Sequence, residues 1–461
     1  MSDPARTPFL PLLATFGDPE SAAIWSEEAA IAAWCAVEVA LAQAQAELGE
    51  IPAADAVAIV TWADPARVAG ERIRDGMRTV GYPILPLLGA LRADAPPGVA
   101  ASLHWGATTQ DIMDSAIALL LARSIDRLDL LVADLGDALC RLTIAHRATP
   151  MAGRTHDQIA VPTTFGAKLA VYLDELIRHR ERLATARRRA AVVSLFGAGG
   201  TSAALGARSA AVRSGVARRL GLVDTGIPWH VARDAIAEAG FAAAAAASTA
   251  SRLAKEIVAL SRSEVDEVRE AGGHHRGASS TMPQKVNPIA SETIIGFSLQ
   301  AAAQVPVLLA AMQPRHERAA GEWQAEWDAL PLLMTSAAGA LATAGEAVRG
   351  LRVDPGRMAR NLDLEGGMVM AEAVMMALAP HVGRGPAHDL VYAACTLARG
   401  EERPLAEALE LTLAPELRAA LPPIAELLDP ATYLGEAPAF ADRAAAAWRA
   451  GRSRTQTEEE R

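Results

Sequence analysis

The chain is poor in aromatic residues, in cysteine and in net positive charge. Only 4% of its 461 residues are aromatic although 51% are hydrophobic, so small aliphatic side chains must fill the core, which favours packed helices over sheets. The three cysteines, Cys35, Cys140 and Cys395, lie far apart without metal-motif spacing, which argues against disulfides and predicts reduced thiols in a cytoplasmic protein. A net charge of −10 argues against nucleic acid as a partner.

Targeting segments and common nucleotide or hydrolase motifs are also missing. The N-terminus lacks the basic region and apolar run of a signal peptide. The longest uncharged window, 293–314, is long enough to cross a bilayer, but Gln300, Gln304 and Pro306 interrupt it. We therefore expect a helix buried on most sides and no membrane partner. No Walker loop, HExxH or GxSxG motif is found.

Helical periodicity dominates what is present. Long patterns of apolar residues at three- and four-residue steps cover residues 111–146, 162–193, 236–271, 288–312 and 322–349. Shorter helical patterns precede and follow them. The sequence predicts an all-α fold with an N-terminal helical domain (1–102), a central bundle of long helices (103–350) and a C-terminal helical domain (351–461) that ends in a disordered tail.

Three polar junctions between these helices contain similar kinds of polar side chain. They read HWGATTQD (His104–Asp111), GRTHDQ (Gly153–Gln158) and SSTMPQKVNP (Ser279–Pro288), and each places hydroxyls and amides beside a histidine or a lysine. Such groups, with backbone N–H groups at helix starts, suit a carboxylate ligand. None of the junctions has enough acids or cysteines for a metal site, so we expect no metal ion there.

A proton could be moved at such a site. Removing a proton from carbon next to a carboxylate adds negative charge, which requires donors aimed at its oxygens. Ser279 could be the base if its loop lowers the pKa of the hydroxyl, and His156 or His104 could protonate the leaving atom. The structural alternatives are that the serines only cap the following helix and that each histidine only satisfies a hydrogen bond.

The motifs resemble those of the fumarase/aspartase superfamily, whose signature loop GSSxMPxKxNP reads GASSTMPQKVNP here, with Ala278 between the glycine and Ser279. The other two junctions follow in the family's order, and RHERAAGEWQAEWDALP from Arg315 is similar to its adenylosuccinate lyase and 3-carboxy-cis,cis-muconate cycloisomerase branch. The resemblance implies a cofactor-free lyase and a homotetramer whose active sites combine segments of three subunits. It implies the base Ser279 and the acid His156, with the substrate bound by His104, Thr108, Thr109, Gln110, Arg154, Thr155, Gln158, Arg233, Ser280, Met282, Lys285, Asn287 and Arg318.

Within that branch the sequence leaves two activities open. Overall similarity favours a muconate cycloisomerase, but those enzymes usually have tryptophan at the position of His156, so a histidine there favours β-elimination from a small substituted succinate, with release of fumarate. Trp327 stands where adenylosuccinate lyases have a substrate-binding arginine, so we expect a pocket without a phosphate. Ala232 replaces a glutamine near Arg233, which predicts a smaller and less polar pocket. A catalytically idle structural homologue is a third interpretation, and the arginine-rich run from Arg178 supports a nucleic-acid module only weakly.

Overall fold

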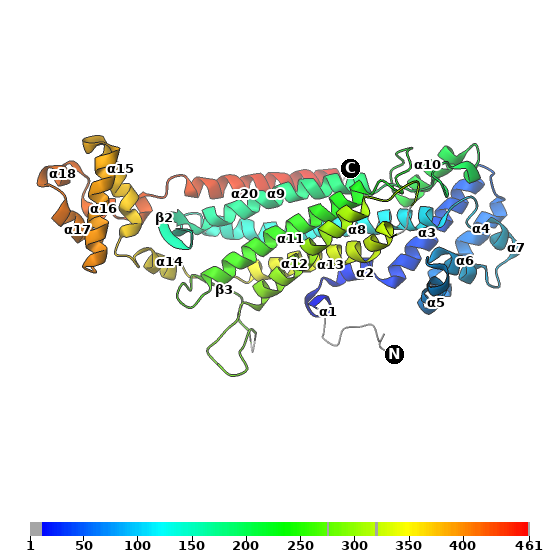
Figure 1. The fold of residues 1–461 in the computed structure, drawn as a ribbon, viewed down its shortest axis with the longest axis horizontal. Coiled ribbons are helices and arrows are strands. Elements are labelled where there is room, and N and C mark those ends of the chain that lie inside the picture. Colours follow the sequence, from blue (N-terminus) through cyan, green and yellow to red (C-terminus); the bar gives the residue numbers. More distant parts are fainter. Residues whose placement is uncertain (1–11, 274–275, 319–320, 460–461) are drawn as a thin grey trace. The chain divides into compact units, whose positions relative to one another are not determined.

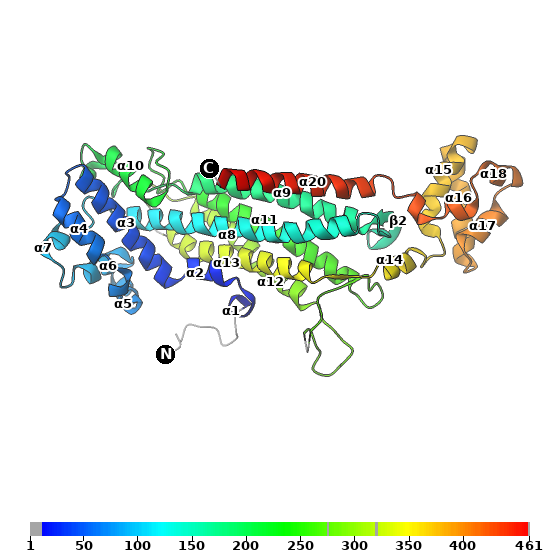
Figure 2. The same ribbon diagram turned by 180° about the vertical axis from the view of Figure 1, so that it is seen from behind.

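The computed structural model describes the backbone of residues 12–273, 276–318 and 321–459, with side chains as far as residue 452. Residues 1–11, where the sequence lacks a signal-peptide pattern, lie outside this part. The predicted all-α class is confirmed, because 70% of the residues are helical and 5% are in strands (Figures 1 and 2). The three cysteines are unpaired.

The chain divides into two compact units. The first contains the residues as far as 132, with 179–251 and 293–343, and the second contains 133–178, 252–292 and 344 onwards. The boundaries fall inside the five long helices, which are α8 (Thr109–Ala145), α9 (Phe165–Ala190), α11 (Asp234–Leu260), α12 (Ile289–Ala311) and α13 (Glu322–Arg349). The division into three domains therefore stays a prediction about how the chain is organised.

Two of the long helices differ from the predicted ranges for local reasons. Helix α9 begins three residues later than expected because the preceding segment pairs as strand β2 (Gln158–Thr164) with β1 (Pro150–Thr155). The Thr164 hydroxyl then accepts a hydrogen bond from the Ala167 N–H at 3.0 Å and caps the helix. Helix α11 ends at Leu260 rather than Ala271, because the chain turns to pair β3 (Val268–Arg269) with β4 (Arg352–Val353).

The first unit begins with a series of helices, and two of its α-helices have a side-chain N-cap. The series consists of α1 (Leu12–Phe16), α2 (Pro19–Ile24), α3 (Glu27–Glu47), α4 (Ala53–Trp62), α5 (Gly70–Val80), α6 (Ile84–Arg92) and α7 (Pro97–Ser102), with η1 (Pro65–Arg67) between α4 and α5. Further along are η2 (Ala203–Leu205) and α10 (Ser209–Leu220), which packs on α3 (Figure 1). Ser26 caps α3 by accepting the Ala29 N–H at 3.1 Å. This hydrogen bond fixes where α3 begins.

The second unit carries the C-terminal helices. They are α14 (Pro355–Leu362), η3 (Met368–Met370), α15 (Ala371–Val382), α16 (Arg384–Gly400), α17 (Leu405–Thr412), α18 (Pro415–Ala420), α19 (Ile424–Leu427), η4 (Pro430–Thr432) and α20 (Ala437–Glu459). Helix α20 packs on α8 where Gly136 leaves room for Trp448, since a Cβ at Gly136 would lie 2.1 Å from the indole. Contrary to the predicted disordered tail, α20 continues to Glu459. Once a helix has formed, each further residue that becomes ordered gains one backbone hydrogen bond without a new nucleation step.

Helix α12 is less buried than its composition predicts. Helices α3 and α12 are long and apolar enough to cross a membrane by length and composition, but only 33% of the apolar window of α12 is buried. Leu299 is 64% exposed and Leu309 is 52% exposed. The prediction of a helix buried on most sides is thus wrong for a single chain, since no described segment of the same chain covers these leucines.

Candidate active site

The first junction is fixed to a glycine-rich segment by Asp111. Its carboxylate accepts hydrogen bonds from the backbone N–H groups of Thr108 at 3.0 Å, Phe196 at 2.8 Å and Gly197 at 3.0 Å. Burial raises the pKa of Asp111, and the three N–H groups oppose that shift. Thr108 and Thr109 stay partly exposed at the start of α8. Asp111 therefore positions the threonine pair.

Helix α3 holds the beginning of the same junction. His104 has a left-handed backbone (φ 66°), and its Nδ1 lies 2.6 Å from Oε1 of Glu38, whose side chain is fully buried. The Gln45 side chain donates to the Trp105 carbonyl at 2.8 Å. A non-glycine residue with positive φ costs free energy and persists where surrounding contacts impose it. The hydrogen bonds from α3 to His104 and Trp105 impose the backbone conformation in this way.

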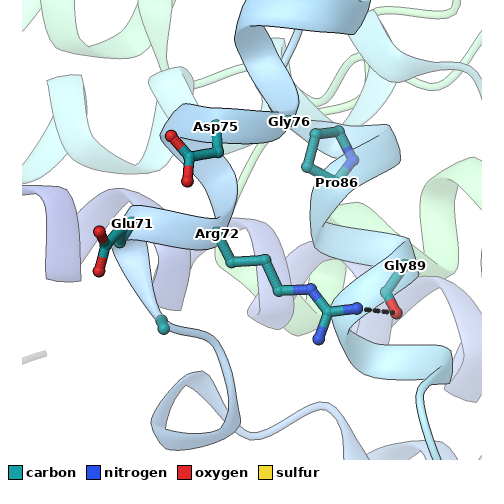
Figure 3. A pocket seen from close by; sticks show the side chains of 7 residues that line it. Glu71, Arg72, Asp75, Gly76, Pro86 and Gly89 are labelled. Carbon is teal, nitrogen blue, oxygen red and sulfur yellow. Dashed lines mark hydrogen bonds between the residues drawn. The ribbon is translucent and has the colours of Figure 1, made fainter.

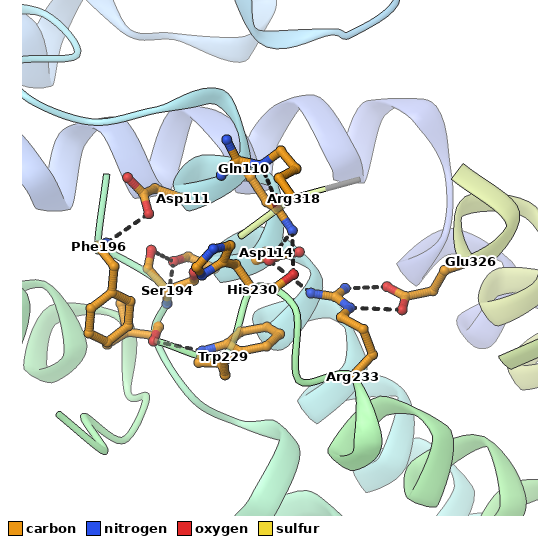
Figure 4. A network of polar contacts seen from close by, with 12 residues as sticks. Gln110, Asp111, Asp114, Ser194, Phe196, Trp229, His230, Arg233, Arg318 and Glu326 are labelled. Atoms are coloured by element: carbon orange, nitrogen blue, oxygen red, sulfur yellow. Dashed lines mark hydrogen bonds and ion pairs between the residues drawn. The ribbon is translucent and has the colours of Figure 1, made fainter. Parts of the chain in front are cut away.

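Arg233 lies in a buried ion network rather than at an open surface (Figure 4). It is 2% exposed and donates to Glu326 Oε2 from Nε at 3.0 Å and to Asp114 Oδ2 from Nη1 at 2.8 Å. Burial raises the pKa of Asp114 to about 6, although Arg233 opposes that shift. The sequence prediction of Arg233 as a substrate ligand does not fit these contacts, because its donors are used by two carboxylates.

Gln110 belongs to the same network and is 2% exposed. Its amide donates to the His230 carbonyl at 2.8 Å, and its oxygen accepts from Arg318 Nε at 2.5 Å. Arg318 also donates to the Ala198 carbonyl at 2.8 Å. Gln110 thus positions Arg318 and is no longer a good candidate for direct substrate binding, since its amide and its oxygen are both occupied.

His230 connects this network to the segment before α13. Its Nε2 lies 2.6 Å from the Glu317 carbonyl, so Nε2 carries the proton and donates it. Nδ1 is buried and has no hydrogen-bond partner among the described residues. Burial lowers the pKa of His230. The folded protein therefore favours the neutral ring.

This depressed pKa predicts a loss of stability in acid. The contribution of His230 is present above its unfolded pKa of about 6.5 and is lost as the pH falls through the lower folded value. We expect the free energy of unfolding to fall more steeply between pH 7 and pH 5 in the wild type than in His230→Gln, measured by urea unfolding at each pH. Equal slopes for the two proteins would contradict this assignment.

The second junction forms the tip of the β1–β2 hairpin. His156 (φ 53°) and Asp157 (φ 60°) are the two turn residues, and both adopt the left-handed conformation that such turns require. Thr155, His156 and Gln158 are exposed. Arg154 instead points inward, where Nη1 and Nη2 lie 3.0 and 2.7 Å from the Glu267 carboxylate. Arg154 therefore anchors the hairpin, and its predicted role as a substrate ligand loses support.

The third junction is a loop closed at its base. The Asn287 N–H donates to the Gly277 carbonyl at 2.8 Å, and Gly277 has φ 68°. Glu270 accepts the N–H groups of Ala290 at 3.1 Å and Ser291 at 2.8 Å at the start of α12. Both contacts fix where the loop leaves the helical body.

The upper part of this loop presents the predicted base. The Ser279 hydroxyl oxygen accepts hydrogen bonds from the backbone N–H groups of Thr281 at 3.3 Å and Met282 at 3.2 Å. Ser280, Met282 and Lys285 are exposed, and Asn287 is partly buried. Two donors on one hydroxyl oxygen stabilise its anion more than the neutral group.

The predicted residues thus fall into two groups. The first unit holds His104, Thr108, Thr109, Gln110, Arg233 and Arg318, and the second holds Arg154, Thr155, His156, Gln158, Ser279, Ser280, Met282, Lys285 and Asn287. The sequence interpretation missed the acidic partners that hold these residues, which are Glu38, Asp111, Asp114, Glu267 and Glu326. One signal was available, because a glutamate in the apolar stretch around Glu38 needs a polar partner when buried.

Two cavities lie apart from these contacts. A surface pocket of about 570 Å³ between α5 and α6 is lined by Glu71, Arg72 and Asp75 among others, and Arg72 donates to the Gly89 carbonyl at 3.3 Å (Figure 3). It contains none of the predicted site residues. A second cavity of about 230 Å³ is lined by four of the chain's eight tryptophans, Trp327 included. This cavity also contains none of the predicted site residues.

Four of the six arginines in the arginine-rich run of α9 pair with acids of the same chain. Arg178, Arg180, Arg187 and Arg189 form ion pairs with Asp174, Asp129, Asp126 and Glu238, respectively. These pairs favour a solvated helix face over a nucleic-acid surface. Among the described residues, no three histidine, cysteine, aspartate or glutamate side chains are grouped so as to hold a metal ion.

Family comparisons agree with this architecture. A family described as "Lyase" matches residues 15–303, and one described as "Adenylosuccinate lyase C-terminus" matches residues 367–444. Together with the three junctions on a helical fold, these matches place the chain in the fumarase/aspartase superfamily. It is an enzyme of the lyase class, and enzymes of this superfamily act on small dicarboxylates.

Individual relatives cover almost the full length. Trans-aconitate decarboxylase 1 of Mycosarcoma maydis is 37% identical over 96% of this chain and 89% of its own length. Nitrosuccinate lyase of Streptomyces davaonensis is 40% identical over 93% of this chain and 92% of its own. The crystal structure of 3-carboxy-cis,cis-muconate lactonizing enzyme from Pseudomonas putida is 35% identical, with a TM-score of 0.89 over 95% of this chain and 98% of that chain.

Proposed function

We propose that this lyase carries out a cofactor-free β-elimination on a small substituted succinate and releases fumarate. The observation that carries the proposal is the Ser279 hydroxyl, which accepts two backbone N–H groups on an exposed loop. This arrangement favours the alkoxide that a serine base needs. The similarity to a nitrosuccinate lyase supports a substrate of this size.

The proposed chemistry assigns the remaining polar groups to the two carboxylates. Thr108 and Thr109 at the start of α8 would bind one, and Lys285 and Asn287 would bind the other, because hydroxyl, ammonium and amide donors suit carboxylate oxygens. Ser279 removes the proton on the carbon next to a carboxylate, and the extra charge moves onto that carboxylate. The bond to the leaving group then breaks, and the double bond of fumarate forms.

We infer that the proposed active site combines several subunits. Helix α12 exposes apolar side chains to solvent in the single chain. A homotetramer, in which helices of other subunits cover α12, accounts for this exposure because contiguous apolar surface marks a protein interface.

Charging the exposed face of α12 is expected to disrupt the assembly. Leu299→Glu, at a side chain that is 64% exposed, should shift the protein from tetramer to smaller species and lower activity at least about tenfold, because a buried unpaired charge costs several kcal/mol. Sedimentation velocity and the fumarate assay would measure both. Leu411→Glu is the matched control, since Leu411 is 63% exposed on α17. An intact tetramer in both variants would remove α12 from the interface.

A muconate cycloisomerase is the second candidate, favoured by the similarity to the lactonizing enzyme at a TM-score of 0.89. Its reaction closes a lactone ring without losing a group. This chain departs from those enzymes at His156, where a cycloisomerase usually has tryptophan, and we take that departure, independently of which histidine is the acid, to favour elimination. One assay separates the two activities, because fumarate absorbs in the ultraviolet and ring closure removes the muconate absorbance.

The test offers the purified enzyme aspartate, nitrosuccinate, thioether-substituted succinates and 3-carboxy-cis,cis-muconate in turn. Fumarate from any succinate derivative supports the proposed elimination and identifies its leaving group. Loss of muconate absorbance, without fumarate from the other substrates, replaces the proposal with the cycloisomerase. If no substrate gives fumarate and the muconate absorbance is unchanged, both candidate functions are contradicted.

A further inference from the structure

The buried carboxylate of Glu38 has one described partner, which is the ring of His104. Oε1 lies 2.6 Å from Nδ1, while Oε2 is buried without a hydrogen bond to any described residue. A buried carboxylate without a donor costs free energy, so the residue needs this ring. Glu38 also lies seven residues before Gln45, which holds the next carbonyl of the same junction, so one face of α3 supports it.

This contact fixes which ring nitrogen is available. Because an ionised carboxylate can only accept a hydrogen bond, Nδ1 of His104 carries a proton and donates the hydrogen bond to Glu38, and Nε2 is left to face the substrate. The carboxylate also lies beside the ring as a counter-charge when both ring nitrogens carry protons. His104 is 14% exposed in its side chain, so the ring is held between α3 and the surface. A ring oriented in this way suits the transfer of a proton at Nε2.

The other candidate acid has no comparable support. His156 lies at an exposed hairpin tip, and its ring makes no hydrogen bond or ion pair with a described residue. A general acid needs a fixed position as well as a proton. The two histidines therefore differ in how firmly the fold fixes the ring, which is the property that a general acid needs.

We propose that His104 supplies the proton to the leaving group, with Glu38 as its positioning residue, an inference that rests on the proposed elimination. Ser279 takes the proton from carbon, the electron pair of that C–H bond becomes the double bond, and the pair of the breaking bond goes to the leaving atom. That atom receives the proton from Nε2 of His104, whose ring enters the step protonated on both nitrogens. The products are fumarate and the protonated leaving group, and His104 is left neutral.

The experiment uses leaving groups that differ in their need for a proton. Thioethers of succinate release alkyl thiols, with a pKa of about 8.5, or more acidic aryl thiols, whereas nitrosuccinate releases nitrite, which leaves as a stable anion. His104→Asn suits the left-handed backbone at this position. It should lower kcat/KM about 10² to 10⁴-fold for the alkyl thioether, less for the aryl thioether and less than about tenfold for nitrosuccinate.

Glu38→Gln keeps the shape of the side chain and removes its charge. It should lower kcat/KM for the three substrates in the same order as His104→Asn, but by smaller factors, about tenfold for the alkyl thioether. His156→Asn is the matched variant of the other histidine. It should lower kcat/KM by a similar factor for all three substrates. A loss in His104→Asn that is equal for every leaving group, or a graded loss in His156→Asn instead, overturns the assignment.

Failure of the elimination itself is a separate outcome. If the wild-type enzyme forms no fumarate from these substrates, the proposed function is wrong and His104 has no leaving group to protonate, which overturns its acid role too. The positioning by Glu38 is still measured by ¹⁵N NMR of histidine-labelled protein. Protonated Nδ1 in the wild type, with a mixture of tautomers in Glu38→Gln, supports it, and an unprotonated Nδ1 in the wild type overturns it.

Discussion

Replacing Ser279 with alanine is expected to lower kcat/KM for fumarate release by at least about 10³-fold, as the loss of a base does, while the protein stays folded and assembled. The hydroxyl accepts N–H groups from Thr281 and Met282, and these donors have no role in holding the helical body together. Steady-state kinetics gives the first result. Thermal unfolding and sedimentation, which should match the wild type, give the second.

Thr281→Ala is the matched control for this variant. It removes a hydroxyl two residues away on the same loop but keeps the backbone N–H that Ser279 accepts. We expect its kcat/KM to stay within about threefold of the wild type, as for a side chain without a role in the transition state. Near-normal turnover in Ser279→Ala would remove Ser279 as the base, and similar losses in both variants would show that loop conformation matters more than the hydroxyl.

Elements governed by local physics were predictable from the sequence. Helices α8, α12 and α13 begin and end within two residues of their apolar periods, because a repeated apolar face specifies the helix directly. Gly277, with φ 68°, closes the base of a signature loop, as a glycine in the left-handed region does. The candidate chemistry of Ser279 also follows from short-range contacts within one loop.

Contacts between distant residues were not predictable from periodicity. Arg154 pairs with Glu267 across 113 positions, and His104 contacts Glu38 across 66. Whether an arginine binds substrate or a buried carboxylate depends on what the fold brings beside it, and a motif identifies only one of the two partners. For this reason the motifs predict Arg154 and Arg233 as substrate ligands, whereas the structure places both against internal acids.

Replacing Arg233 with leucine is expected to lower the free energy of unfolding by roughly 3 to 5 kcal/mol, the cost of leaving a buried charge without its partner. Asp114 and Glu326 are 0% and 2% exposed, so neither can regain water without local unfolding. Urea denaturation at pH 7 measures the change. Arg187→Leu breaks an exposed pair with Asp126 and should cost less than about 1 kcal/mol.

The same variants separate a structural arginine from a substrate ligand. If Arg233 only joins α8 to α13, adding Asp114→Leu and Glu326→Leu to Arg233→Leu should recover part of the lost stability, because an apolar replacement of a whole buried ion network is often tolerated. Recovery would show that the penalty came from the unpaired carboxylates. If Arg233 instead bound substrate, Arg233→Leu would unfold like the wild type. The variant would then differ from the wild type by a raised KM in the fumarate assay.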